Sequence, residues 1–330
     1  MSDALYDVVG IGNAIVDVVA DADDAFLEAE AITKGAMTLI DGPRAEALYA
    51  AMGPAIEVSG GSAANSLAGL AALGARCAFI GKVRDDPLGR IFRHDIVAAG
   101  VDFDTTPATD GAPTARCLIF VTPDAQRSMG TMLGACTQLG PEDVDAAKIA
   151  AAKVTYLEGY LWDPPLAKEA FLKAARIAHE AGREVALSLS DPFCVERHRE
   201  EFRQLVDGHV DLLFANEVEI CSLYQVATFD EALQAVRGRC AVSALTRSEK
   251  GAVVLGGGEV HVVDAAPVDK VVDTTGAGDL YAGGFLYGYT GGRSLYDCGR
   301  IGAIAAAEVI SHYGARPEAP LADLVAQRMA

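Results

Sequence analysis

The chain has 330 residues, 51% of them apolar, and its 46 acidic and 27 basic side chains give a net charge of −19. This composition supports a sizeable core and disfavours nucleic acid or an anionic membrane as partners, because both require a basic surface. The sequence contains no run of 18 apolar residues and no basic signal-peptide start. We expect a cytoplasmic protein with small-molecule partners, either a monomer or a homodimer, a choice that the sequence does not decide.

Cysteines and histidines give no sign of a metal centre. None of the seven cysteines forms a Cys-x-x-Cys pair, and the six histidines lie far apart. Free thiols in a reducing compartment are expected, and a zinc site is not.

The first part of the chain alternates apolar strands with helical patterns. Tyr6–Ile11 is typical of a buried first strand, and Ile15–Ala20 follows it as a second strand after a turn. A helix over 62–73, a strand over 77–81 and a helix over 87–99 come next. Two strands, 114–122 and 127–133, are then joined by the turn residues 123–126, which predicts a β-hairpin.

From residue 154 onward strands and helices alternate regularly, which predicts a mainly parallel sheet with helices on both faces. We expect one α/β domain over 1–330, with a small, discontinuous β lid formed by two helix-free stretches at about 14–42 and 102–137. The remaining strands are expected at 154–157, 184–189, 211–214 and 241–245, and the helices at 165–181, 217–224, 229–237, 276–289 and 294–311.

The stretch Asp273-Thr-Thr-Gly-Ala-Gly-Asp279 precedes an apolar helical pattern. Gly276 and Gly278 permit a tight turn beside a ligand, and the unpaired amides at a helix start attract an anion such as phosphate. A carboxylate repels phosphate, so Asp279 needs another role, and accepting a proton from a hydroxyl is the natural one. The alternative is a threonine-capped helix whose glycines only make the turn.

A second glycine-rich turn, Gly60-Gly61-Ser62-Ala63-Ala64-Asn65, also leads into a helix, and Asn65 could reach back to a ligand over it. Asn13 and Asp17 follow the first strand, at the edge where open α/β sheets bind ligands. Asp17 interrupts an apolar run, and sugar hydroxyls would suit it as partners. The alternatives are a turn before a capped helix, and an Asp on the solvent side of a lid strand.

Polar residues also follow two later strands. Asn216 and Glu219 share one helix face and could hold Mg²⁺ through water, although an N-cap with acidic first-turn residues is an equal alternative. The segment Thr246–Gly251 could contact nucleotide phosphates or be an ordinary charged hairpin loop. The sequence has no P-loop and no protein-kinase signature set, and its Gly10-Ile11-Gly12 lacks the third glycine of a dinucleotide fingerprint.

In this order, these motifs resemble the ribokinase/PfkB family of carbohydrate and nucleoside kinases over nearly the whole chain. The resemblance implies a ribokinase-like fold, ATP and Mg²⁺ as cofactors, and a sugar or nucleoside as acceptor. Within the family, Gly12–Asp17, Gly61–Ser66 and Arg127-Ser128 followed by Gly134-Ala135 resemble the adenosine kinase branch. The lid sequence 129–134 departs from the Asn-Leu-Ala-Ala run of that branch.

The resemblance implies a role for each matching residue. Asp279 is the base, and Gly276, Ala277 and Gly278 form the anion hole. Asp17, Gly61 and Asn65 hold the ribose hydroxyls, with Asn13 and Ser62 nearby. Asn216 and Glu219 organise Mg²⁺ and the triphosphate through water, and Thr246, Gly251 and Thr275 lie along the ATP site. Arg127 points from the lid to the phosphates. The residues that pack on the adenine ring are Met37, Leu39, Met129 and Tyr160. Asp273 and Thr275 form a K⁺ site, as in several family members.

Three functions remain open at this point. The first is phosphorylation of the adenosine 5′-hydroxyl, which the apolar Met37, Leu39 and Met129 favour. The second is phosphorylation of a free sugar such as ribose or fructose. The third is a non-catalytic, ligand-binding protein on the same fold.

Overall fold

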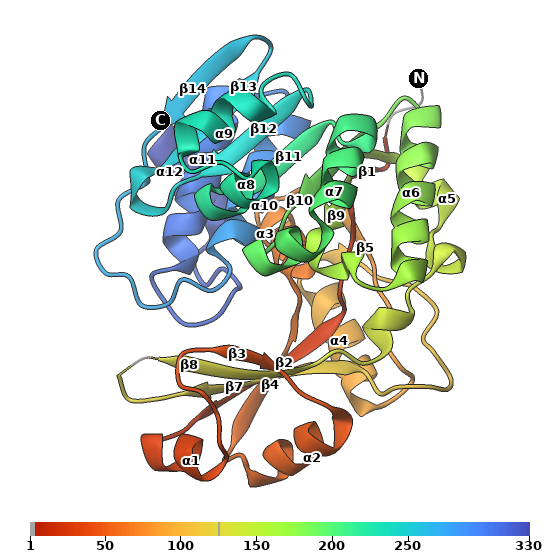
Figure 1. Cartoon of the computed structure of the whole chain (residues 1–330), viewed down its shortest axis with the longest axis vertical. Helices are drawn as coiled ribbons and strands as arrows, with labels where there is room; N and C mark the ends of the chain where they lie inside the picture. Colours follow the sequence, from red (N-terminus) through yellow and green to blue (C-terminus); the bar gives the residue numbers. More distant parts are fainter. Residues whose placement is uncertain (1–3, 125) are drawn as a thin grey trace.

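The computed structural model of the protein describes residues 4–124 and 126–330, whose strands form two sheets (Figure 1). From β6 to β12 the larger sheet is parallel, and its last two strands are antiparallel. In spatial order its nine strands are β14 (Glu259–Val263), β13 (Ala252–Gly256), β12 (Val242–Thr246), β11 (Leu212–Asn216), β10 (Glu184–Ser188), β9 (Ala152–Glu158), β1 (Tyr6–Ile11), β5 (Cys77–Ile80) and β6 (Val101–Asp102).

Helices cover both faces of this sheet, because successive residues of its buried strands point to opposite sides. In β1, Val8 packs in the cluster that contains Leu67 and Phe285, whereas Val9 packs in the cluster that contains Phe171. The helices of the first face are α3 (Ser62–Ala72), α4 (Pro87–Ala98), α10 (Ala277–Thr290) and α11 (Leu295–Val309), with α12 (Leu321–Met329) packed on α11. Those of the second face are α5 (Ala146–Ala150), α6 (Pro165–Glu180), α7 (Pro192–His209), α8 (Glu217–Tyr224) and α9 (Phe229–Val236).

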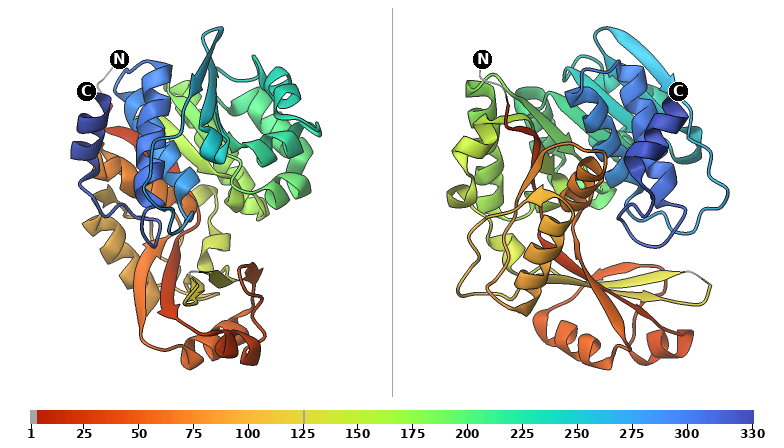
Figure 2. Two further views of the ribbon diagram at one scale, coloured as in Figure 1. Left: turned by 90° about the vertical axis from the view of Figure 1, so that its left-hand side faces the viewer. Right: turned by 180° about the vertical axis from the view of Figure 1, so that it is seen from behind.

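The smaller sheet projects from the body like a cover (Figures 1 and 2). Its strands, in spatial order, are β3 (Met37–Leu39), β8 (Arg127–Met132), β7 (Ala115–Val121), β2 (Ile15–Asp21) and β4 (Ala55–Gly60). Helices α1 (Asp24–Ala29) and α2 (Gly42–Ala51) cover the face that points away from the body. The ring centroids of Phe26 and Phe120 lie 5.2 Å apart, and Leu27 and Leu48 are buried under these helices. The uncovered face is therefore left for a ligand.

The chain passes between the sheets at two points that matter for the site. β1 of the large sheet runs directly into β2 of the small one, and β4 of the small sheet leads back through Gly61 into α3. At Gly61 the backbone has a φ of 101°, and an added Cβ would collide with the carbonyl oxygen of Asn13. Only glycine permits both the positive φ and this close approach.

The predicted fold class and the β7–β8 hairpin are confirmed, although Ala125 of its turn lies outside the described residues. The prediction that residues 14–42 contain only strands is wrong. The Asp23 carboxylate accepts a hydrogen bond from Phe26 N at 2.8 Å and so begins α1. The prediction also missed β4, β13, β14, α7 and α12. All seven cysteines are free, as expected, and none of the described helices could span a bilayer.

Candidate active site

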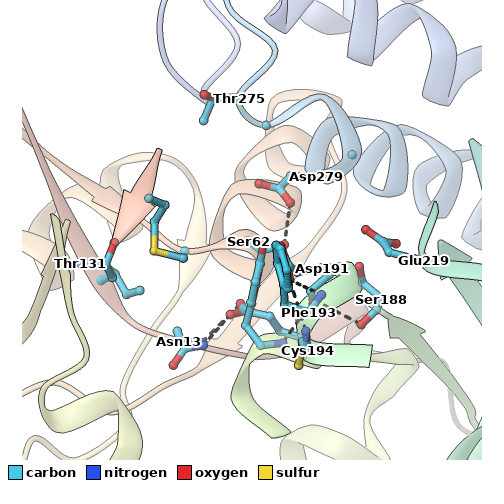
Figure 3. A pocket seen from close by; sticks show the side chains of 18 of the residues that line it. Asn13, Ser62, Thr131, Ser188, Asp191, Phe193, Cys194, Glu219, Thr275 and Asp279 are labelled. Carbon is cyan, nitrogen blue, oxygen red and sulfur yellow. Dashed lines mark hydrogen bonds between the residues drawn. The ribbon is translucent and has the colours of Figure 1, made fainter. Parts of the chain in front are cut away.

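A cavity of about 890 Å³ lies between the carboxyl ends of the large sheet's strands and the inner face of the small sheet (Figure 3). Strand ends of the large sheet contribute Glu158, Ser188, Asn216 and Thr246 to its wall, and α10 contributes its first turn. Because the strands of the sheet are parallel, their carboxyl ends meet at one edge, where open α/β sheets place their ligands.

Asp279, in the first turn of α10, is held by two side chains of α3. Ser62 Oγ donates to Asp279 Oδ1 at 2.6 Å (Figure 3), and Asn65 Nδ2 donates to Oδ2 at 3.1 Å. Burial raises the pKa of Asp279, while these two hydrogen bonds and the charge of Arg316 oppose that rise. The result is a fixed carboxylate in the cavity wall with an increased affinity for a proton.

The amides beside Asp279 are free to bind an anion. Within the described ranges, the backbone N–H groups of Gly276, Gly278 and Asp279 have no acceptor. At Gly276 φ is 77°, and an added Cβ would lie 2.7 Å from the Cβ of Ala315, so this glycine is needed by the fold. Gly278 is exposed, and an added Cβ would meet nothing within 4 Å. Its lack of a side chain therefore leaves space for a ligand rather than for a neighbour.

Asp17 projects from β2 into the cavity on the same strand face as Ile15 and Val19. Its carboxylate has no hydrogen-bond partner in the part of the chain that the structure describes. An added Cβ on Gly60, in the neighbouring strand β4, would collide with this carboxylate, so the glycine makes room for it. Burial raises the pKa of Asp17 to about 6, against the opposing charges of Arg316 and Arg127.

Glu158 is a site residue that the sequence reasoning missed. It ends β9, is 1% exposed, and lines the cavity. Its Oε1 accepts from Asn13 Nδ2 at 2.7 Å, and its Oε2 accepts from Ala63 N at 2.8 Å. Burial raises its pKa to about 7 although these donors lower it. Asn13, expected near the ribose, thus lies at the cavity with its amide nitrogen held by Glu158. A carboxylate directly after a predicted buried strand was the signal that could have found Glu158.

Asn216 and Glu219 form a capping box at the start of α8. Asn216 Nδ2 donates to Glu219 Oε1 at 2.6 Å, and Glu219 N donates to Asn216 Oδ1 at 2.9 Å. The N-cap alternative is therefore confirmed. Both residues also line the cavity, so the predicted role as Mg²⁺ ligands stays a prediction. Burial and the charges of Asp191 and Asp279 raise the pKa of Glu219 to about 7. A buried carboxylate that is repelled by other acids suits a nearby hydrated cation such as Mg²⁺.

Asp273 and Thr275 are engaged in a different way from the one expected for K⁺ ligands. Asp273 Oδ1 accepts from Thr275 N at 3.0 Å and from Thr275 Oγ1 at 2.8 Å. Asp273 Oδ2 accepts from Gly314 N at 3.0 Å and forms an ion pair with Arg127 Nη1 at 2.9 Å. Four donors, one of them a guanidinium, fill the carboxylate, so the side chain of Asp273 is not free to bind a monovalent cation. Arg127 itself lies outside the cavity wall.

The small sheet supplies an apolar wall at the far end of the cavity. Met37 is 50% exposed and Leu39 is 59% exposed although both face this cavity, and Met129 pairs with Met37 in the neighbouring strand. Tyr160 and Phe193 contribute aromatic rings from the body, and Phe193 is 70% exposed. Exposed apolar and aromatic groups around a cavity indicate a site for a flat, apolar ligand surface.

The structure gathers most of the predicted site residues at this one cavity. Asn65 does not line the cavity but donates a hydrogen bond to Asp279, which does. Gly251 does not line the cavity either. Gly251 has a φ of 79° and packs against the Val263 carbonyl, so it serves the β12–β13 connection. The predicted residues that line the cavity are Asn13, Asp17, Met37, Leu39, Gly61, Ser62, Met129, Tyr160, Asn216, Glu219, Thr246, Thr275, Gly276, Ala277, Gly278 and Asp279.

Comparison with known proteins gives consistent results. A family model described as pfkB family carbohydrate kinase matches residues 56–322. The structure of an adenosine kinase from Sinorhizobium meliloti is 56% identical, covers 99% of this chain and 100% of that one, and superposes with a TM-score of 0.91. A probable sugar kinase from Rhizobium etli CFN 42 is 55% identical, covers 99% of both chains and has a TM-score of 0.92. An ATP-dependent ribose-1-phosphate kinase from Halopiger xanaduensis is 33% identical, over 81% of this chain and 85% of the relative.

The fold and the site, with a carboxylate beside a cluster of free amides, define a kinase that phosphorylates an alcohol group of a sugar or nucleoside. The chain belongs to the PfkB family of carbohydrate kinases, and it uses ATP as that family does.

Proposed function

We propose that this kinase transfers the γ-phosphoryl group of Mg-ATP to the 5′-hydroxyl of adenosine, giving AMP and ADP. The observation that carries the proposal is the placement of Asp279, fixed by Ser62 at 2.6 Å beside the free amides of α10. Asp279 takes the proton of the hydroxyl as its oxygen forms the new bond to phosphorus. The bond from the γ-phosphorus to the bridging oxygen breaks, and that oxygen leaves with ADP.

Charge stabilisation is the second requirement of phosphoryl transfer. The N–H groups of Gly276 and Gly278 and the positive end of the α10 dipole face the transferring group in this proposal. Mg²⁺, when bound, would neutralise the triphosphate, and Asn216 and Glu219 would hold it through water. Because protein donors occupy the side-chain oxygens of Asp273, we assign no K⁺ to that carboxylate.

Adenosine as the acceptor is supported by the two ends of the cavity. The unpartnered carboxylate of Asp17 can accept hydrogen bonds from two vicinal ribose hydroxyls. The apolar wall of Met37, Leu39 and Met129 offers a surface on which a purine can stack, whereas a free sugar would leave that wall uncovered. The 56% identical relative from Sinorhizobium meliloti is described as an adenosine kinase.

Phosphorylation of a free or phosphorylated ribose is the second candidate. The lid segment 129–134 departs from the Asn-Leu-Ala-Ala run of the adenosine kinase branch, and a 33% identical relative is described as an ATP-dependent ribose-1-phosphate kinase. Both candidates use the same chemistry at Asp279 and differ only in what covers the apolar wall.

One experiment separates the candidates. ADP formation would be measured with adenosine, inosine, guanosine, ribose, ribose 1-phosphate and fructose, with and without K⁺, for the wild type and Asp279→Asn. We expect the highest kcat/KM with adenosine and AMP as the product, and the comparison with and without K⁺ tests whether a monovalent cation takes part. Asp279→Asn should keep adenosine binding and lose about 10²–10⁴-fold in turnover. A higher kcat/KM with a sugar than with adenosine would show that the acceptor is a sugar. Near-normal turnover of Asp279→Asn would show that Asp279 is not the base.

A further inference from the structure

Arg316, in the segment after α11, places a positive charge behind the cavity without forming an ion pair. Its Nη1 donates to Ala64 O at 3.0 Å, and its Nη2 donates to Ser59 O at 2.7 Å and to Ser59 Oγ at 2.8 Å. Its Nε is shielded from solvent and has no partner, and none of the described carboxylates lies within ion-pair distance. A shielded cation whose direct acceptors are all uncharged is costly to keep in a fold, so its position needs a reason. The carboxylates whose charges favour it are Asp95, which accepts from Ser59 Oγ, and then Asp17 and Asp279.

The position of Arg316 gives a first reason. Ser59 and Ala64 lie on either side of the Gly60-Gly61 turn, so the guanidinium fork bridges the end of β4 and the first turn of α3. That first turn carries Ser62 and Asn65, the two side chains that donate to Asp279. The backbone of Ser59 is fixed from the other side as well, because its N–H donates to Asp95 Oδ2 at 2.8 Å. Arg316 therefore holds the peptide segment from which the donors of Asp279 project.

The charge of Arg316 gives a second reason. The titratable groups that interact with Asp279 from the elements around it are acids: Asp17 on β2, Glu158, Tyr156 and Tyr160 on β9 and the turn that follows, and Glu219 on α8. The three carboxylates, when ionised, repel a negative charge on Asp279, whereas burial raises the pKa of both tyrosines, so that their phenols stay neutral and place no charge near it. Arg316 is the one described cation whose charge lowers the pKa of Asp279, and it lowers the pKa of Asp17 as well.

We propose that Arg316 is a positioning residue for phosphoryl transfer, whose permanent charge favours the proton-accepting form of Asp279 and whose fork holds the β4–α3 turn. This inference rests on the proposed role of Asp279 as the base. It assigns a function in the reaction to a residue that touches neither the acceptor nor the phosphates.

The test is the pH dependence of kcat/KM for the acceptor, measured from pH 5 to 9 for the wild type, Arg316→Met and Arg316→Lys. At low pH, kcat/KM falls as Asp279 becomes protonated, and we call this part of the pH profile the acidic limb. Loss of the charge in Arg316→Met should move the acidic limb to higher pH by about one unit, so that kcat/KM at a given pH on that limb falls about tenfold. Arg316→Lys keeps the charge and loses the fork, so its limb should stay in place while kcat falls. Arg90→Met, which removes an exposed arginine paired with Asp85, is the matched control and should change neither quantity.

Each outcome decides the question. An unshifted acidic limb in Arg316→Met, with a uniform loss of activity, would reduce Arg316 to a structural residue and overturn the proposal. If Arg316→Met does not fold, Arg316→Gln, which keeps an amide donor for Ser59, takes its place with the same expected shift. A limb that moves equally in Arg316→Lys would also contradict the role of the charge. Failure of the proposed function is distinguishable, because then Asp279→Asn itself would remain active.

Discussion

Arg127 and Asp273 form a buried ion pair between the small sheet and the loop that precedes α10, with Nη1 and Oδ2 2.9 Å apart. Both side chains are less than a tenth exposed, and Arg127 Nη1 also donates to Thr275 Oγ1 at 3.1 Å. The pair therefore fastens β8 of the small sheet to the loop that carries the free amides.

Breaking this pair should destabilise the protein. Removing one partner of a buried ion pair leaves the other charge without compensation, and we expect Arg127→Met and Asp273→Asn each to lower the free energy of unfolding by about 3 kcal/mol. Because the two residues are in contact, the double variant should lose about 1–3 kcal/mol less than the sum of the single losses. Urea denaturation measures all three values. Strict additivity would show that the pair contributes nothing of its own.

Ser62→Ala should change the pH dependence of activity. The Ser62 hydroxyl lowers the pKa of Asp279, so its removal raises that pKa further. The base must be ionised to act, and the acidic limb of kcat/KM should therefore move to higher pH by about one unit. Thr228→Ala is a suitable control, because it removes an exposed capping hydroxyl of α9 and should cost about 1 kcal/mol of stability without moving the limb. If the acidic limb of kcat/KM does not move in Ser62→Ala, this hydrogen bond does not affect the protonation of the base.

Two glycines of α10 should respond to alanine in opposite ways. Gly278→Ala meets no neighbour, so we expect it to stabilise the helix by up to about 1 kcal/mol while the methyl group obstructs the triphosphate and raises the KM for ATP. At Gly283 the added Cβ would lie 2.6 Å from the carbonyl oxygen of Ser66 on α3. Gly283→Ala should therefore lower the melting temperature and kcat together, because it separates the two helices that carry Asp279 and its donors. Melting curves and ATP titrations of the two variants would check both expectations. An unchanged KM for ATP in Gly278→Ala would contradict the first, and an unchanged melting temperature in Gly283→Ala would contradict the second.

The stability of the protein without ligands should depend on Glu158 above pH 5. Its pKa is about 7 in the folded state against an ordinary value of 4.5, so the folded protein prefers the protonated form. The stabilisation is therefore complete below pH 4.5 and is lost as the pH rises to 7 and beyond. Glu158→Gln keeps the neutral form at every pH, and the decrease in unfolding free energy between pH 5 and 8 should shrink by about 3 kcal/mol. Equal slopes in the variant and the wild type would show that Glu158 is not the group that titrates.

The sequence predicted the buried strands and the glycine motifs well, because both have strong local signals. Tyr6–Ile11 is uninterrupted and apolar, and it forms β1 with those bounds. The missed elements have weak signals of their own. β4 exposes Ile56 by 73% and obtains its pairing from β2, a partner that is distant along the chain. Strands stabilised by pairing rather than by burial cannot be recognised from local periodicity alone.

The site was predicted where one motif carries its own geometry, and it was missed where distant segments meet. Asp279 and its glycines are adjacent in sequence, so the sequence could predict that they line one site. Arg316 and Glu158 reach the site only because α3, β9 and the segment after α11 converge there. Nothing near Asp273 in the sequence indicated that Arg127, almost 150 positions earlier, would fill its carboxylate.

The residues that we propose for acceptor binding and for proton transfer are attached to different sheets of this molecule. Asp17, the proposed acceptor-binding carboxylate, belongs to β2 of the small sheet, whereas Asp279 and the free amides belong to α10 on the large one. Selectivity and chemistry can therefore diverge independently in evolution. Remodelling the small sheet would recruit a new alcohol while the phosphate-handling machinery of the body stays untouched.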